Sequence, residues 1–149
     1  MTRGARSWLP GTPGFATAVP QQDYLAALLA DVEGCLEGGA RSTVSHAELK
    51  VISIAVEMLG RRSWLAGLTG YSWICLWISG QLRPFVRVDE LPPRLCSLLV
   101  EWVGLSRRYL HSPGQASAAV ALARHLGDAR WDRPLEAIEL QAVVAELMA

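Results

Sequence analysis

The chain has 149 residues, a formal net charge of zero and 51% hydrophobic residues. A domain of this length buries roughly 68–70% of the surface that its unfolded chain exposes, so a stable core needs neither a structural metal nor disulfides. The three cysteines lie far apart and include no C-x-x-C pair (Cys35, Cys75 and Cys96). This odd number argues against a disulfide-stapled secreted domain and indicates free thiols in a reducing compartment.

Charge is distributed unevenly along the chain. Residues 61–125 contain eight arginines against three acids, a net charge of +5. Residues 21–40 contain four acids and no base, and residues 126–149 carry a net charge of −3. A basic middle between acidic ends predicts a polarised surface that meets a polyanion or an acidic partner.

Residues 1–20 are predicted to form an extended arm in front of one helical domain over residues 21–149. The arm becomes ordered only if Trp8 and Phe15 dock on another surface. Its prolines interrupt the apolar run that a signal peptide requires, so we expect a cytoplasmic protein. These prolines are Pro10, Pro13 and Pro20.

The first two helices carry clear sequence signals. A helix that starts after Pro20 has apolar residues at helical spacing and stops at Gly38 and Gly39. In the second helix, Ser45 and Glu48 have the S-x-x-E spacing of a capping box. The expected buried stripes are Leu25, Leu28, Leu29, Val32 and Leu36 in the first helix and Ile52, Ala55, Val56 and Leu59 in the second.

Residues 63–82 are twenty residues without a charge. A membrane span is one interpretation, because about twenty apolar residues cross a bilayer. Glycine and hydroxyl residues dilute the stretch, and bases flank both ends, so we favour a central helix buried on every side. Residues 67–70 predict a break between two helices.

The rest of the chain predicts further helices and no strand with a regular alternation. Prolines over residues 83–93 predict a connection, with a short extended piece at residues 85–88. A helix then begins near Pro93 and ends at residues 111–114, and alanine-rich residues 115–126 form a short one. The last helix is predicted over residues 134–147. The fold is therefore predicted as an all-α, single-domain bundle of about six helices.

Enzyme signatures are nearly absent, and we predict no catalytic residue, metal or cofactor. The three histidines form no H-x-x-x-H pair, and the chain contains no G-x-S-x-G or phosphate loop. Asp128 and Asp132 flank Trp131, but a helix-capping role explains Asp132. These histidines are His46, His111 and His125.

Arginine pairs next to aromatic residues are the remaining candidates for function. Such pairs follow a glycine at two predicted helix ends, where they can hold phosphates while the aromatic ring stacks on a base. The alternative is that these arginines complement helix dipoles and form surface ion pairs. The predicted nucleic-acid contacts are Arg61, Arg62, Arg83, Arg87, Arg107 and Arg108, with Trp64 and Tyr109 as stacking or partner-contact residues.

Residues 98–110, read LLVEWVGLSRRYL, resemble the late helix of the small subunits of CRISPR effector complexes. The resemblance implies a non-catalytic helical bundle that serves antiviral defence. Copies of such subunits stack along a guide-RNA complex and touch the nucleic-acid backbone. Carried over by position, it implicates Arg107 and Arg108 in that contact.

We therefore predict a non-enzymatic assembly subunit of a nucleoprotein complex, which binds RNA or single-stranded DNA backbone and neighbouring protein subunits and self-associates. The alternative is a regulator or adaptor whose exposed Trp and Leu patch binds a partner helix without nucleic acid. A membrane-associated protein is the third possibility.

Overall fold

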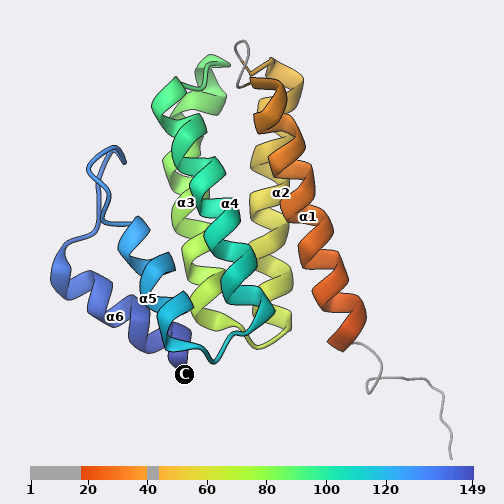
Figure 1. Cartoon of the computed structure of the whole chain (residues 1–149). Helices are drawn as coiled ribbons and strands as arrows, with labels where there is room; N and C mark the ends of the chain where they lie inside the picture. The colour runs from red at the N-terminus through yellow and green to blue at the C-terminus, as the bar shows by residue number, and fades with distance from the viewer. Residues whose placement is uncertain (1–17, 40–43) are drawn as a thin grey trace, which may run out of the picture.

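A computed structural model describes residues 18–39 and 44–149, and the described chain is all α-helical. Its elements, drawn in Figure 1, are α1 (Ala18–Gly39), α2 (His46–Leu65), α3 (Thr69–Val88), α4 (Pro93–His111), α5 (Ala116–His125) and α6 (Ala137–Met148). The predicted six-helix bundle is confirmed. The predicted arm lies outside the described residues, except that residues 18–20 belong to the first turn of α1, where a proline is tolerated.

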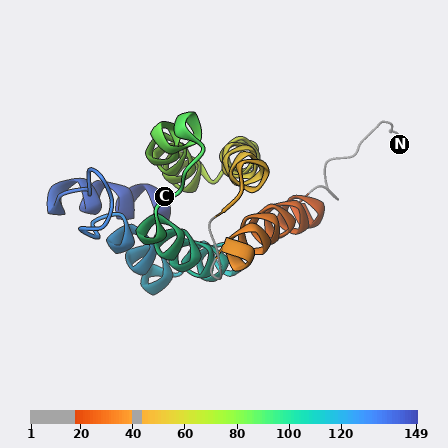
Figure 2. The ribbon, with the colours of Figure 1, turned by 90° about the horizontal axis from the view of Figure 1, so that it is seen from above.

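The helices form a closed ring of neighbouring pairs. α1 packs on α2, α2 on α3, α3 on α6, α6 on α5, α5 on α4, and α4 on α1. Seen along the long helices, α2 and α3 lie on one side, α1, α4 and α5 on the other, and α6 closes the ring (Figure 2). The two short C-terminal helices therefore join α3 to α4.

Aromatic side chains fill the centre of this ring. The Tyr71 ring of α3 stacks on Trp102 and Tyr109 of α4, with ring centroids 6.4 and 5.9 Å apart. All three side chains are buried. Such large rings bridge two helices whose backbones do not meet, and they supply much of the apolar burial of the core.

The N-terminal half follows its sequence signals closely. The predicted stripes of the first two helices are buried. The Ser45 hydroxyl accepts a hydrogen bond from the Glu48 N–H at 3.1 Å, and the Glu48 carboxylate accepts one from the Ser45 N–H at 3.0 Å. The predicted break is also present, since α2 ends at Leu65 and Gly67 adopts a φ of +83°.

Residues 83–88 are not a connection, because α3 continues through Pro84 to Val88. The proline removes one backbone hydrogen bond, but buried Leu82 and half-buried Phe85 hold both flanks of that turn on the core. α3 ends instead at Asp89, which adopts a left-handed φ of 56°. The predicted extended piece at residues 85–88 is therefore wrong.

α3 is also not buried on every side. Tyr71, Ile74 and Ile78 face the core, whereas Trp73 and Leu76 are exposed. No helix among the described residues has the length and apolar character needed to span a bilayer. The uncharged stretch thus covers the end of α2 and most of α3, and α3 exposes apolar side chains on its outer face as well as burying others in the core.

The last helix is shorter than predicted. α6 begins at Ala137, after a reciprocal cap in which the Glu136 and Glu139 side chains accept from each other's backbone N–H. Asp132 is not the predicted cap, because Glu136 is the residue before α6; the Asp132 backbone N–H donates to Gln81 Oε1 at 3.3 Å. All three cysteines are free, and burial raises the pKa of the Cys75 thiol.

Two buried tyrosines give a matched test of the core. The Tyr109 hydroxyl donates to the Leu147 carbonyl at 2.8 Å and so attaches the end of α6, whereas the Tyr71 hydroxyl, beside Ser106 and Cys75, has no hydrogen-bond partner. Tyr109→Phe should lower the free energy of unfolding by about 1 kcal/mol, because it leaves a buried carbonyl unpaired. Tyr71→Phe should leave the free energy of unfolding unchanged in urea denaturation. An equal loss in both variants would contradict the assignment of a hydrogen bond to Tyr109 alone.

Candidate functional site

The six arginines predicted to contact nucleic acid do not share one surface. α2 and α4 run in the same direction, so Arg61, Arg62, Arg107 and Arg108 lie at the end of the bundle where these two helices finish (Figure 1). α3 runs in the opposite direction and carries its arginines, Arg83 and Arg87, to the other end. The charged block of the sequence is therefore divided between two ends.

Several members of the predicted nucleic-acid site already have partners within the fold. Arg107 forms a two-pronged ion pair with Glu33 of α1, at 2.8 and 2.9 Å, and this hydrogen bonding lowers the pKa of Glu33. The Arg62 guanidinium lies 4.4 Å from the centre of the Tyr24 ring. Tyr109 is buried, so its ring cannot stack on a base, and that part of the prediction is wrong. The nucleic-acid contact itself stays a prediction.

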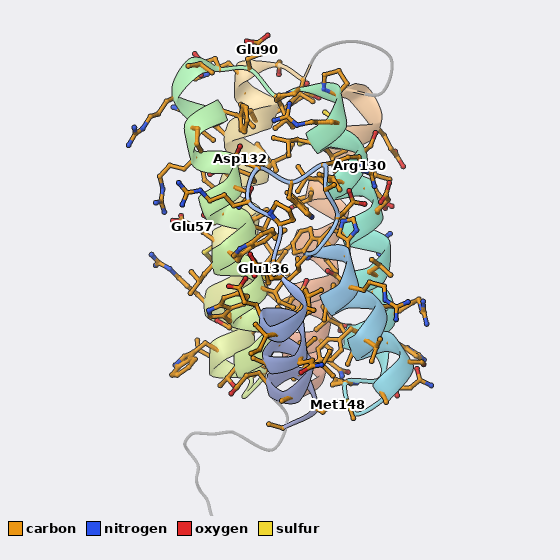
Figure 3. The ribbon with its side chains drawn as sticks, turned by 90° about the vertical axis from the view of Figure 1, so that its left-hand side faces the viewer. Glu57, Glu90, Arg130, Asp132, Glu136 and Met148 are labelled. Carbon is orange, nitrogen blue, oxygen red and sulfur yellow. The ribbon has the colours of Figure 1, made fainter. Side chains whose placement is uncertain are left out.

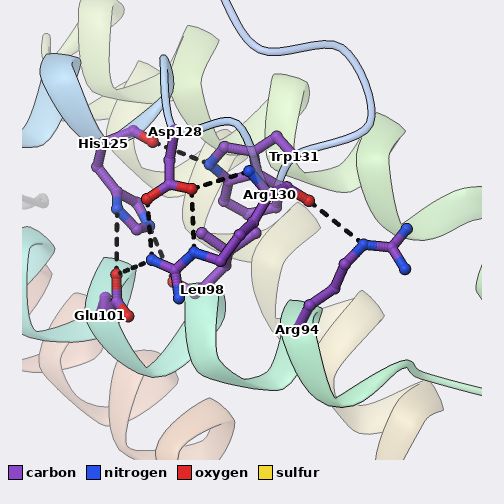
Figure 4. A network of polar contacts seen from close by, with 7 residues as sticks. All are labelled: Arg94, Leu98, Glu101, His125, Asp128, Arg130 and Trp131. Atoms are coloured by element: carbon purple, nitrogen blue, oxygen red, sulfur yellow. Dashed lines mark hydrogen bonds and ion pairs between the residues drawn. The ribbon is translucent and has the colours of Figure 1, made fainter.

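A polar network between α4 and the loop after α5 is the main cluster of titratable groups in the described residues (Figure 4). Arg130 donates to Asp128 Oδ1 and Oδ2 at 3.0 and 2.9 Å and to Glu101 Oε1 at 2.7 Å. Buried His125 accompanies them and makes a 2.9 Å hydrogen bond from Nε2 to the Leu98 carbonyl. The sequence analysis missed this network, for which the Asp-x-Arg spacing at residues 128–130 is the only local signal.

We call this network of Glu101, His125, Asp128 and Arg130 the clasp, because it ties α4 to the loop after α5 and leaves no open site. Glu101, His125 and Asp128 present ligand atoms within 4.8 Å of one another, the arrangement that a cation would need. The Arg130 guanidinium bonds to both carboxylates and already supplies that positive charge. Hydrogen bonds from Arg130 lower the pKa of Asp128 to about 2, and burial lowers the pKa of His125. The clasp fixes the loop that leads into α6.

The candidate functional site is a groove between α3 and α6, with a volume of about 580 Å³. Its apolar walls come from Trp64 in the last turn of α2, Trp73 and Leu76 on the outer face of α3, and Val143 of α6. The first three side chains are 63%, 45% and 59% exposed. Two tryptophans and a leucine therefore share one groove and form an exposed apolar patch there. We call it the α3–α6 groove.

The rim of the α3–α6 groove on the α6 side is acidic. Glu139 and Glu146 line the groove, are exposed, and lie seven residues apart, so they share one face of α6. No cation of the described chain forms an ion pair with either of them. Figure 3 views this side of the molecule, where α6 runs between the labelled Glu136 and Met148.

Gly70 sets how closely α6 approaches the start of α3. A Cβ atom on Gly70 would lie only 2.7 Å from the backbone carbon of Glu146, so only glycine permits this contact. The sequence analysis noted Gly70 as part of a break and missed this packing role. It predicted Trp64 as a contact residue, and the structure places that side chain at the end of the groove.

A second groove lies on the other side of the α2–α3 turn. It has a volume of about 600 Å³ and lies between α1, this turn and the end of α4. Leu25, Leu29 and Leu68 contribute apolar lining, and Arg107 is its ion-paired cation. We call it the α1–α4 groove.

Comparisons with protein-family models, curated proteins and solved structures found no match to the chain. The geometry of these two grooves is therefore the basis for assigning a function.

The glycine contact between α3 and α6 can be tested by adding one methyl group. Gly70→Ala should destabilise the protein by about 1–3 kcal/mol, because rigid backbone cannot move away from the new Cβ as a side chain would. Gly80→Ala is the matched control: the same helix has open space at that position, so alanine should be neutral or stabilising by up to about 1 kcal/mol. Equal effects in thermal unfolding would contradict the role of the contact.

The clasp should make stability depend on pH in a defined window. The pKa of Asp128 is about 2 in the folded state and 3.8 ordinarily, so its contribution is complete only above about pH 5 and is lost as pH falls through 3.8 toward 2. Arg130→Gln removes the cation that lowers this pKa. The native chain should therefore exceed Arg130→Gln in urea midpoint at pH 6, and the gap should close toward pH 2.5. A constant gap would contradict the assignment.

Proposed function

We propose that the chain is a non-catalytic helical interaction subunit that binds a basic, amphipathic segment of another protein in the α3–α6 groove. The observation that supports this most directly is the pairing of exposed Trp64, Trp73 and Leu76 with an acidic rim. Recognition of an amphipathic helix by an apolar groove is a common mode of protein binding, with anchors at helical spacing.

The chemistry of the groove defines the partner. Large apolar walls accept a bulky side chain such as Leu, Phe or Trp, which would displace water from both indole rings. Glu139 and Glu146 are spaced by about 10.5 Å along α6, so they match two cations about two turns apart on a partner helix. Charge complementarity of this kind selects the partner and its orientation more than it adds affinity.

The nucleic-acid function predicted from the sequence has less support. Arg61 and Arg108 are exposed at one end, but Arg107 is paired with Glu33 and Tyr109 is buried. A polyanion would also meet Glu33 beside Arg107. We therefore treat RNA binding as an outcome of the test and not as the proposal.

The proposal is tested with a fluorescent Leu/Arg peptide of about 18 residues, five helical turns, with the cations on one face. Fluorescence polarisation should show binding to the native chain and none for the Leu/Glu peptide. Glu139→Gln with Glu146→Gln should weaken binding by roughly tenfold, because two rim ion pairs contribute about 0.5–1 kcal/mol each. Glutamine keeps the oxygen that accepts the Glu136 N–H.

The matched control removes the same charge from α1. Asp23→Asn with Asp31→Asn changes two exposed acids outside the groove and should leave the affinity unchanged. Trp73→Ala should weaken binding of the peptide as well. If poly-U RNA binds, and loses binding with Arg107→Glu and Arg108→Glu, while the peptide does not bind, the nucleic-acid function replaces this proposal.

A further inference from the structure

We infer that residues 3–9 of this chain bind in its own α3–α6 groove and compete there with the partner segment. This inference rests on the proposed function, because it assigns a second occupant to the same groove. It depends on three observations: the composition of that segment, the place where it joins the bundle, and the charge of the two grooves.

The composition of the segment matches the groove. Arg3 and Arg6 are followed by Trp8 and Leu9, which combine two cations with two bulky apolar side chains. The first acid of the chain is Asp23. The segment thus offers what the walls and rim of the groove accept: apolar groups for Trp64, Trp73 and Leu76, and cations for Glu139 and Glu146.

The segment joins the bundle at the end where the groove begins, next to the α2–α3 turn. α1 begins at the same end of the bundle where α2 ends and α3 begins (Figure 1). The Arg62 guanidinium lies 4.4 Å from the centre of the Tyr24 ring, so the second turn of α1 lies against the last turn of α2, two residues before Trp64. Eight residues separate Leu9 from Ala18, and the nine steps between them span at most about 30 Å when extended. A tether of this length gives a local concentration on the order of millimolar.

Charge decides between the two grooves. The α1–α4 groove is adjacent to α1, but its cation Arg107 is already paired with Glu33 and none of its lining residues is an acid, so it offers nothing to Arg3 and Arg6. The α3–α6 groove instead carries two acids without an ion-pair partner in the described chain. Opposite charges favour the second groove at short range.

The inference is tested in the full chain by reversing the two cations. Arg3→Glu with Arg6→Glu should release the groove, so the Leu/Arg peptide should bind about tenfold more tightly than to the native chain. Arg83→Glu with Arg87→Glu changes the net charge equally at the opposite end of the bundle and should leave the affinity within about twofold of native. Equal affinity in the Arg3/Arg6 variant and the native chain would overturn the inference and leave the proposed function intact.

A crosslink gives a second, independent readout. A photoreactive benzoylphenylalanine at position 8 should crosslink to residues 69–76 or 139–146 of the same molecule, as shown by mass spectrometry of the monomer. Crosslinks to the α1–α4 groove, or only between two copies, would overturn the inference. Crosslinks at the expected residues, with no peptide binding even by the Arg3/Arg6 variant, would support the inference and overturn the proposed function.

Discussion

The close contact between α3 and α6 closes the ring of helices and positions the C-terminal helix. Gly70 lets the backbone of Glu146 approach the first turn of α3, and the Tyr109 hydroxyl holds the neighbouring Leu147 carbonyl. Because α6 is fixed to α3 and α5 is fixed to α4, these short helices close the ring around the stacked aromatic core. The same contact places the acidic face of α6 beside Trp73. This backbone contact at Gly70 therefore forms one end of the groove.

Much of the helical architecture could be predicted from local sequence. The Ser45–Glu48 box begins α2 because its reciprocal bonds satisfy two free N–H groups without help from the fold. The prediction of a connection at Pro84 was wrong, because the packing of Leu82 and Phe85 on the core outweighs the lost backbone hydrogen bond. Glu136 was missed because its cap uses a carboxylate where the sequence rule looks for Ser or Thr. Local rules fail where tertiary packing compensates for a poor local choice.

The location of the candidate site could not be predicted in the same way. Residues 63–82 carry no charge and place bulky apolar side chains on more than one side of α3, so periodicity does not show which side faces the core. The core side is chosen by Tyr71, which reaches two aromatic residues of α4, and Trp73 then points outward. Likewise, Arg87 and Arg107 belong to the same basic block of the sequence but lie at opposite ends of the bundle. The reason is that α3 and α4 run in opposite directions. Charge along a chain becomes charge on a surface only after the topology is known.

Exposure of the two tryptophans is the feature that the fold itself does not require. Trp102 and Trp131 are buried, and the Trp131 indole N–H donates to the His125 carbonyl at 3.0 Å, so they serve the core. Trp64 and Trp73 contribute little to that core, yet both line a groove with two acids that form no ion pair within the described residues. Isolated apolar side chains on a surface need no explanation, but a shared groove exposes their area to water at a cost that a bound segment would remove. Because a basic segment is part of the same chain, any outside partner must bind more strongly than an intramolecular competitor, which would restrict the groove to ligands that satisfy both its apolar walls and its acidic rim.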